Sequence, residues 1–183
     1  MKKSMTKDLV LAGLFLAIGL LLPFLTGQIP EIGSMLLPMH IPVLICGLVI
    51  GWKYGLVVGF ILPLLRNLLF GMPPLFPTGI SMAFELAAYG VICGVLFGSF
   101  KKQNIKTLYI SLIGAMLGGR VVWGIVQATL LGFSGSSLTM SVFMASAFLN
   151  AIPGIILQLV LIPALMVALD RTGMVKFRRE ANV

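Results

Sequence analysis

Six long apolar stretches make up most of this chain, and short polar turns separate them. A helix needs about 20 mostly apolar residues to cross a membrane. The stretches that meet or approach this length are residues 8–26, 35–51, 54–71, 79–100, 107–132 and 142–170. Lipid offers no hydrogen bonds to the backbone, so a spanning segment must satisfy its own polar groups, as a helix does. We therefore predict an all-α integral membrane protein, a compact bundle of six transmembrane helices.

The composition of the chain supports this interpretation. Of the 183 residues, 59% are hydrophobic and only 10% are charged, which is far outside the range of soluble domains. Ordinary soluble folds are therefore excluded, and nucleic-acid binding with them, despite a formal net charge of +8. No linker or change in composition divides the sequence, so we expect residues 1–183 to form a single membrane domain.

The first apolar stretch could also be the core of a signal peptide, because basic residues precede it. However, residues 9–25 are longer than a usual signal core, and no small-x-small cleavage site follows them. We therefore keep this stretch as the first transmembrane helix. The two cysteines, Cys46 and Cys93, lie inside apolar stretches without metal-ligand spacing, and the sequence contains no Walker motif or nucleophile elbow. We expect no catalytic residue, no metal and no cofactor.

The basic residues predict the orientation of the bundle, because lysine and arginine are enriched in cytoplasmic connections. With six spans, all but two of the basic residues lie on one side. They are Lys2, Lys3, Lys7, Lys53, Lys101, Lys102, Lys106, Arg171, Lys176, Arg178 and Arg179. The other three connections contain neither lysine nor arginine. We therefore predict that both termini are cytoplasmic.

The two remaining basic residues belong to a set of polar residues inside the spans. Arg120 lies 14 residues beyond Lys106, or about 20 Å along a helix, which places it in the outer half of the membrane. The same level is predicted for the other members of the set: His40, Arg66, Asn67, Glu85, Gln127 and Asn150. Polar side chains at membrane depth usually face a bundle interior or a wet cavity. We therefore predict a solute pocket that opens outward.

Five of these residues also have a structural interpretation that needs no ligand. Glu85 and Arg120 could simply neutralise each other, and His40 could be an interfacial histidine. Arg66 could extend to the outer surface, and Asn150 could cap the start of a helix. Because all of these side chains converge on one leaflet, a pocket explains the set better than separate interpretations do.

The charge balance of the set indicates the kind of ligand. Two arginines against one glutamate leave a surplus positive charge, which suits a carboxylate or another anionic group. The outer connections 27–38 and 132–141 could close over a small molecule, and the apolar turn 72–77 could form one wall. We expect anion contacts from Arg120 and Arg66, and hydrogen bonds from Glu85, His40, Gln127 and Asn150.

Small residues recur at every fourth position in several spans, as at Gly47, Gly51, Gly55 and Gly59, and at Gly90, Gly94 and Gly98. Such spacing gives a helix a bare stripe on which another backbone can lie closely. We expect most of these stripes to pack within the chain. Gly13 and Ala17 in the first span are the exception, because their surface could dock a partner subunit.

These features together resemble a known family of membrane proteins. A small six-span chain with Gly13-xxx-Ala17 in its first span, the segment LPMHIPV at residues 37–43, and Gly51-xxx-Tyr54-Gly55 after it resembles the substrate-binding S components of energy-coupling factor (ECF) vitamin transporters. The pantothenate- and folate-type members are the most similar. The resemblance extends over essentially the whole chain. The docking motif of the family is Ala-xxx-Ala, and here Gly13 replaces the first alanine with another small residue.

The resemblance implies a function and a set of partners. S components bind a vitamin from outside with high affinity in the plasma membrane of a prokaryote. They deliver it through a module that consists of a transmembrane coupling (T) subunit and two cytoplasmic ATPases. We expect this chain to bind a small anionic water-soluble vitamin without catalysing a reaction itself. Pantothenate is the first candidate, and folate, riboflavin and pyridoxine-type vitamins remain open.

Two other functions are compatible with the sequence. A stand-alone secondary transporter could use Glu85 and His40 to relay protons, although such transporters usually provide polar residues in both halves of the membrane. A membrane-embedded enzyme acting on lipid headgroups would need paired acidic residues for a metal, and only Glu85 is expected within the bilayer. The sequence therefore favours the S component.

Overall fold

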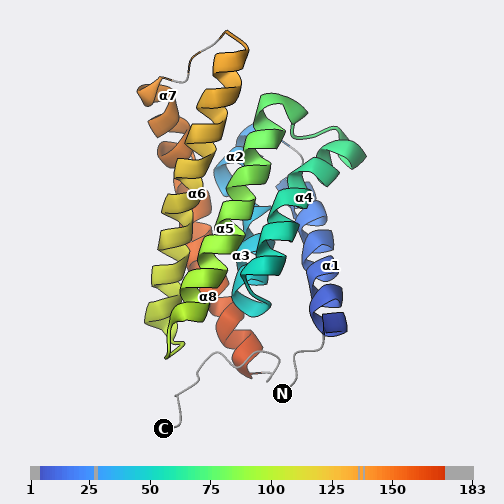
Figure 1. Ribbon diagram of the computed structural model, residues 1–183, viewed down its shortest axis with the longest axis vertical. Helices are drawn as coiled ribbons and strands as arrows, with labels where there is room; N and C mark the ends of the chain where they lie inside the picture. The colour runs from blue at the N-terminus through green and yellow to red at the C-terminus, as the bar shows by residue number, and fades with distance from the viewer. Residues whose placement is uncertain (1–4, 27–28, 136, 138, 172–183) are drawn as a thin grey trace.

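The computed structural model describes residues 5–26, 29–135, 137 and 139–171, and these residues form helices and turns with no strand among them. Five long helices, α1, α4, α5, α6 and α8, run roughly along the long axis of the bundle in Figure 1, and shorter helices connect them. The elements are α1 (Met5–Leu21), η1 (Leu22–Thr26), α2 (Pro30–Leu36), α3 (His40–Val49), α4 (Trp52–Phe70), η2 (Leu75–Gly79), α5 (Ile80–Ser99), α6 (Ile105–Phe133), α7 (Met140–Met144), η3 (Ala145–Leu149) and α8 (Ile152–Arg171).

Five of the six predicted spans are long apolar helical segments in the structure. Each is long and apolar enough to cross a membrane, with bounds at Met5–Leu25, Trp52–Phe70, Leu75–Ser99, Ile105–Phe133 and Met140–Arg171. These segments confirm an all-helical, multi-pass membrane protein. The short helix η1 continues α1, and the last segment consists of α7, η3 and α8 in sequence.

Residues 35–51, predicted as the second span, do not form one continuous helix in the structure. It contains the end of α2, a turn, and the apolar helix α3, which has only ten residues and is about 15 Å long. The break falls at Leu37, which adopts a left-handed conformation with φ 50°. Leu37 precedes Pro38, and a residue before proline is disfavoured in the right-handed helical region. The connection after the first span therefore includes the short helix α2, and the apolar helix α3, which corresponds to the predicted second span, begins only at His40.

Helix α3 lies at the centre of the bundle, because every residue from His40 to Leu48 is buried. Leu44 in α3, Leu86 in α5 and Leu112 in α6 are each fully buried in the core. The five long helices expose apolar side chains to the surroundings, as expected for helices in contact with lipid. Helix α3 is therefore the helix that the others enclose.

Glycines allow α3, α4 and α5 to lie very close together. A Cβ atom at Gly47 would lie 2.6 Å from the carbonyl oxygen of Gly90, and one at Gly94 would lie 2.6 Å from the amide nitrogen of Trp52. A Cβ atom at Gly59 would overlap the backbone of Leu86. These contacts confirm that the small-residue stripes of α3, α4 and α5 pack within the chain. Gly98 differs, since nothing lies within 4 Å of its Cβ position.

The basic residues gather at one end of the bundle, which we call the basic end. In Figure 1, α1, α4 and α6 begin and α5 and α8 finish at this lower end. Their ends carry Lys7, Lys53, Lys102, Lys106 and Arg171. Lys2, Lys3, Lys176, Arg178 and Arg179 lie outside the described residues. The single-sided distribution therefore holds for the described basic residues, apart from Arg66 and Arg120.

Candidate functional site

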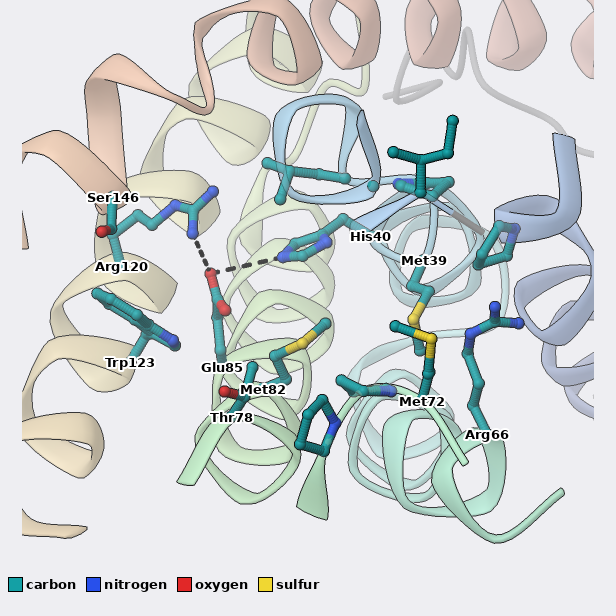
Figure 2. A pocket seen from close by; sticks show the side chains of 17 residues that line it. Met39, His40, Arg66, Met72, Thr78, Met82, Glu85, Arg120, Trp123 and Ser146 are labelled. Atoms are coloured by element: carbon teal, nitrogen blue, oxygen red, sulfur yellow. Dashed lines mark ion pairs between the residues drawn. The ribbon is translucent and has the colours of Figure 1, made fainter. Parts of the chain in front are cut away.

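A cavity of about 540 Å³ lies at the end of the bundle opposite the basic end, and we call that end the cavity end. Its walls come from η1, from the connections 27–38 and 72–78, from α4, α5 and α6, and from Ser146 of η3. None of the described residues of the connection 132–141 lines it, although this connection was expected to close over a ligand. The lining residues are Pro23, Ile29, Gly33, Leu37, Pro38, Met39, His40, Arg66, Met72, Pro73, Pro74, Thr78, Met82, Glu85, Arg120, Trp123 and Ser146 (Figure 2). Its size lies within the range of small-molecule pockets.

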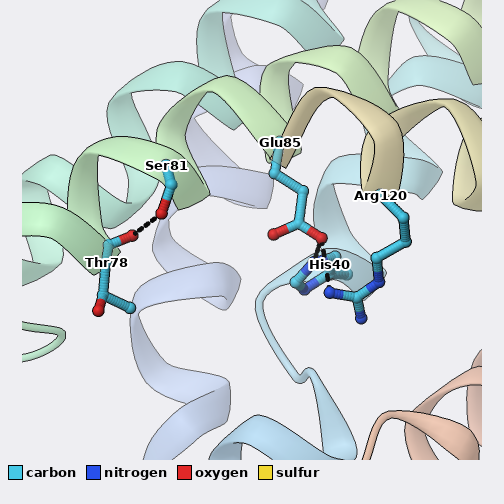
Figure 3. A network of polar contacts seen from close by, with 5 residues as sticks. All are labelled: His40, Thr78, Ser81, Glu85 and Arg120. Carbon is cyan, nitrogen blue, oxygen red and sulfur yellow. Dashed lines mark hydrogen bonds and ion pairs between the residues drawn. The ribbon is translucent and has the colours of Figure 1, made fainter. Parts of the chain in front are cut away.

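Three of the predicted residues form a charged cluster on one wall of this cavity. Oε1 of Glu85, on α5, lies 2.8 Å from Nη1 of Arg120, on α6, and 3.5 Å from Nε2 of His40, the first residue of α3. Figure 3 shows the ion-pair contacts of His40 and Arg120 meeting at the same oxygen of the Glu85 carboxylate. All three residues are at most 5% exposed. The ion pair confirms that Glu85 and Arg120 neutralise each other, as one of the sequence-based interpretations stated.

The cluster leaves several buried polar atoms without a hydrogen-bond partner among the described residues. They are Nε and Nη2 of Arg120, both ring nitrogens of His40, and Oε1 of Glu85, which contacts Arg120 as an ion pair only. Buried polar groups in proteins are nearly always satisfied, and each exception requires an explanation. Since His40, Glu85 and Arg120 all line the cavity, a ligand that supplies acceptors to Arg120 and a donor to Glu85 would complete the cluster.

Arg66 lines the cavity from α4, and Figure 2 shows it on the opposite side from Arg120. Its Nη1 donates a hydrogen bond to the carbonyl oxygen of Leu20, at 2.7 Å. Its guanidinium carbon also lies 5.3 Å and 5.4 Å from the ring centres of Phe24 and Phe70, within cation–π range. Arg66 is only 4% exposed, so the interpretation that it extends to the outer surface is wrong.

Apolar side chains separate the two arginines. Met39, Met72 and Met82 line the middle of the cavity between the two charged walls in Figure 2. Trp123 lies close to Arg120 and stacks on Phe143, with ring centres 6.1 Å apart and planes 22° apart. Methionine side chains are flexible and polarizable, so they adapt to the shape of a bound molecule. The cavity therefore combines an adaptable apolar middle with a cation on each side.

Hydrogen bonds hold the segment between α4 and α5 in place, and this segment shapes part of the cavity. Oγ of Ser81 donates to the carbonyl oxygens of Thr78, at 3.0 Å, and Pro77, at 3.1 Å, and Figure 3 draws the first of these bonds. Nδ2 of Asn67 donates to the carbonyl oxygen of Pro73, at 2.7 Å. As expected, the apolar turn 72–77 forms part of one wall through Met72, Pro73 and Pro74.

Three of the predicted residues do not line the cavity. Asn67 uses its side-chain amide to hold the turn at Pro73. Gln127 lies further along α6 than Trp123, and its buried Oε1 has no hydrogen-bond partner among the described residues. Asn150 is exposed in the turn before α8. The structure therefore brings together His40, Arg66, Glu85 and Arg120, and leaves the other three outside the lining.

Sequence reasoning missed Thr78, Met82, Trp123 and the other apolar lining residues. A signal for some of them was present, because Met82 lies three residues before Glu85 and Trp123 three residues after Arg120, and residues three apart share a helix face. The same reasoning also missed Gln158 on α8, which is 1% exposed and has no partner for Nε2 within the described part of the chain.

Gly13 and Ala17 are both exposed on the outer side of α1. No atom lies within 4 Å of the position that a Cβ atom would take at Gly13. Gly19 of the same helix is different, since it is buried and packs on Leu62 of α4. The small-residue pair therefore leaves a shallow, unoccupied strip on the surface of α1.

Comparison with known proteins gives one match. The sequence model of a family described as "ECF transporter, substrate-specific component" matches residues 7–166. The matched segment contains every described helix except the first residues of α1 and the last turn of α8. No curated protein and no solved structure matches the chain.

Proposed function

The chain belongs to the family of ECF transporter substrate-specific components, and from this premise we propose that it binds a small anionic vitamin in the cavity between Arg66 and Arg120. Members of this family are substrate-binding subunits of transporters, not hydrolases. In our proposal the cavity end faces outward, the basic end faces the cytoplasm, and pantothenate is the first candidate ligand. Excess lysine and arginine on one side supports this orientation.

One observation carries the proposal, namely the unsatisfied donors of Arg120. Glu85 contacts Nη1 only, and the buried Nε and Nη2 have no acceptor among the described residues. The N–H bonds of these two nitrogens lie on the same edge of the planar guanidinium and match the two oxygens of a carboxylate. A carboxylate on this edge would satisfy both donors, and an ionised partner forms the stronger kind of hydrogen bond.

Arg66 determines the net charge that the cavity favours. Glu85 compensates the charge of Arg120, whereas no acidic side chain pairs with Arg66 among the described residues. The surplus positive charge supports an anionic rather than a neutral ligand. The methionines between the arginines suit a ligand with an apolar middle. Pantothenate has a carboxylate, an amide, hydroxyl groups and a branched apolar carbon, so it meets each requirement.

The partners follow from the family and from the surface of α1. We infer that Gly13 and Ala17 dock on a transmembrane coupling subunit, which associates with two cytoplasmic ATPases. Small residues let a second helix approach closely in lipid, and both positions are exposed. A Gly13→Trp variant should keep vitamin binding but lose co-purification with the coupling module. Leu117→Trp, at an exposed position of α6, is the control and should lose neither.

Native mass spectrometry of the purified chain with a panel of vitamins tests the proposed ligand class. We expect one anionic vitamin to remain bound to the wild type and to be lost from Arg120→Gln. Lys102→Gln removes a cation from the basic end and should leave the complex intact.

Uptake measurements test the mode of transport. We expect uptake to require the ATPases of the coupling module. Uptake by the chain alone that collapses with the proton gradient would replace our proposal with a secondary transporter, in which Glu85 and His40 relay protons.

A further inference from the structure

A second hollow lies at the basic end, between the start of α6 and the end of α8. It is a groove of about 750 Å³ that shares no lining residue with the cavity. Ile105 and Tyr109 line it from α6, and Val160, Ala164, Val167 and Arg171 are among the residues that line it from α8. The groove therefore has an apolar floor and one cationic end.

The length of the groove corresponds to one leaflet of a membrane. Val160 and Arg171 are eleven residues apart on α8, which is about 16 Å along the helix. The hydrocarbon core of a bilayer is about 30 Å thick, so each leaflet contributes about half of that. An acyl chain that starts at the membrane surface spans the same depth. Ala164 contributes only a methyl group in the middle of the groove, which leaves room for such a chain.

The cationic end of the groove lies where a lipid phosphate would be. Arg171 is the last residue of α8, is exposed, and has no ion-pair partner among the described residues. Lys101, Lys102 and Lys106 are exposed at the same end. Tyr109 is 36% exposed and brings a hydroxyl group to the groove. Basic pockets between transmembrane helices recognise anionic lipid headgroups, which are enriched in the cytoplasmic leaflet.

We propose that this groove binds one anionic phospholipid, with an acyl chain between α6 and α8 and its phosphate on Arg171. The hydroxyl of Tyr109 is placed to donate a second hydrogen bond to the headgroup. The inference does not depend on vitamin binding, because it uses a different end of the bundle and different residues. It would hold equally for a bundle of another function.

The test is native mass spectrometry of the full chain released from vesicles of phosphatidylglycerol and phosphatidylcholine in equal amounts. We expect the wild type to retain one phosphatidylglycerol in preference to phosphatidylcholine. Arg171→Gln should reduce this preference about fivefold, the usual effect of one cation at a membrane surface. Ala164→Phe should fill the groove and remove the retained lipid without changing any charge.

Matched controls separate the groove from the general charge of the basic end. Lys102→Gln removes an exposed cation outside the groove, and Leu165→Phe enlarges a neighbouring position of α8 that does not line it. Both should retain the lipid like the wild type. Equal losses in Arg171→Gln and Lys102→Gln would overturn the proposal, because binding would then be unspecific. Equal retention of phosphatidylglycerol and phosphatidylcholine by the wild type would also overturn it, because the groove would then show no preference for an anionic headgroup.

Discussion

Neutralising Glu85 should destabilise the bundle strongly, because it leaves a buried cation without its partner. Oε1 of Glu85 lies 2.8 Å from Nη1 of Arg120, and both residues are at most 5% exposed. A Glu85→Gln substitution keeps the shape of the side chain but removes its charge. Loss of one partner of a buried ion pair costs about 3–5 kcal/mol. A chain of this size loses about 2–4 °C of melting temperature per kcal/mol, so we expect a decrease of about 6–20 °C.

The assay is thermal unfolding of the purified chain in detergent, followed by tryptophan fluorescence. The double variant Glu85→Gln/Arg120→Gln removes both charges and should be more stable than Glu85→Gln alone, because no unpaired charge remains. An anionic ligand should restore part of the stability of Glu85→Gln, since it would supply the missing negative charge. The reasoning would be refuted if Glu85→Gln lowered the melting temperature by less than about 2 °C. It would also be refuted if the double variant were less stable than Glu85→Gln.

Two further predictions concern the packing of the helices and the second arginine. Gly59→Ala should lower the free energy of unfolding by about 1–3 kcal/mol, because the added methyl group overlaps the backbone of Leu86. Gly98→Ala, with open space at its Cβ position, should be neutral or stabilising in the same thermal unfolding assay. Equal effects of the two substitutions would contradict the close packing. Arg66→Met should weaken ligand binding in a calorimetric titration about ten- to hundredfold, because it removes a charged donor beside the cavity. Arg66→Lys keeps the charge and should retain more of the affinity. Unchanged affinity in Arg66→Met would mean that Arg66 serves only to hydrogen-bond the carbonyl oxygen of Leu20.

Much of the fold follows from the sequence because membrane helices carry a strong signal. The apolar stretches gave five of the spans within a few residues, and the glycine spacing indicated the close packing of α4 on α5. The short length of α3 was not predicted, because residues 35–51 are apolar apart from His40 and were treated as one span. Pro38 was the signal for the break at Leu37, since a residue before proline is disfavoured in the right-handed helical region.

The candidate site was predictable in part, for a geometric reason. Depth along a helix placed His40, Glu85 and Arg120 at one level, and the structure brings them together. Gln127 faces nearly the same direction as Arg120 but lies seven residues further, or about 10 Å along α6, and it falls outside the lining. The apolar lining residues were not predicted, because an apolar residue in a span carries no sign of whether it faces lipid or a cavity.

The contacts of Arg66 show what tertiary structure adds to the sequence. The position of Arg66 near the end of a span suggested a side chain reaching towards water. The chain instead provides the carbonyl oxygen of Leu20 and the rings of Phe24 and Phe70 around the guanidinium. Phe70 lies one turn beyond Arg66 on α4, so this contact is local. Leu20 and Phe24 lie in α1 and η1, and pairing with such distant segments is not encoded in local sequence patterns.

The central claim is that Arg120 recognises a carboxylate, and one comparison of affinities tests it most directly. Isothermal titration would compare the retained vitamin with its uncharged carboxamide analogue on the wild type and on Arg120→Gln. We expect the wild type to prefer the acid by at least about tenfold, as a charged hydrogen bond requires, and Arg120→Gln to lose that preference. If the carboxamide binds the wild type as tightly as the acid, or if Arg120→Gln keeps the preference, then Arg120 does not recognise a carboxylate.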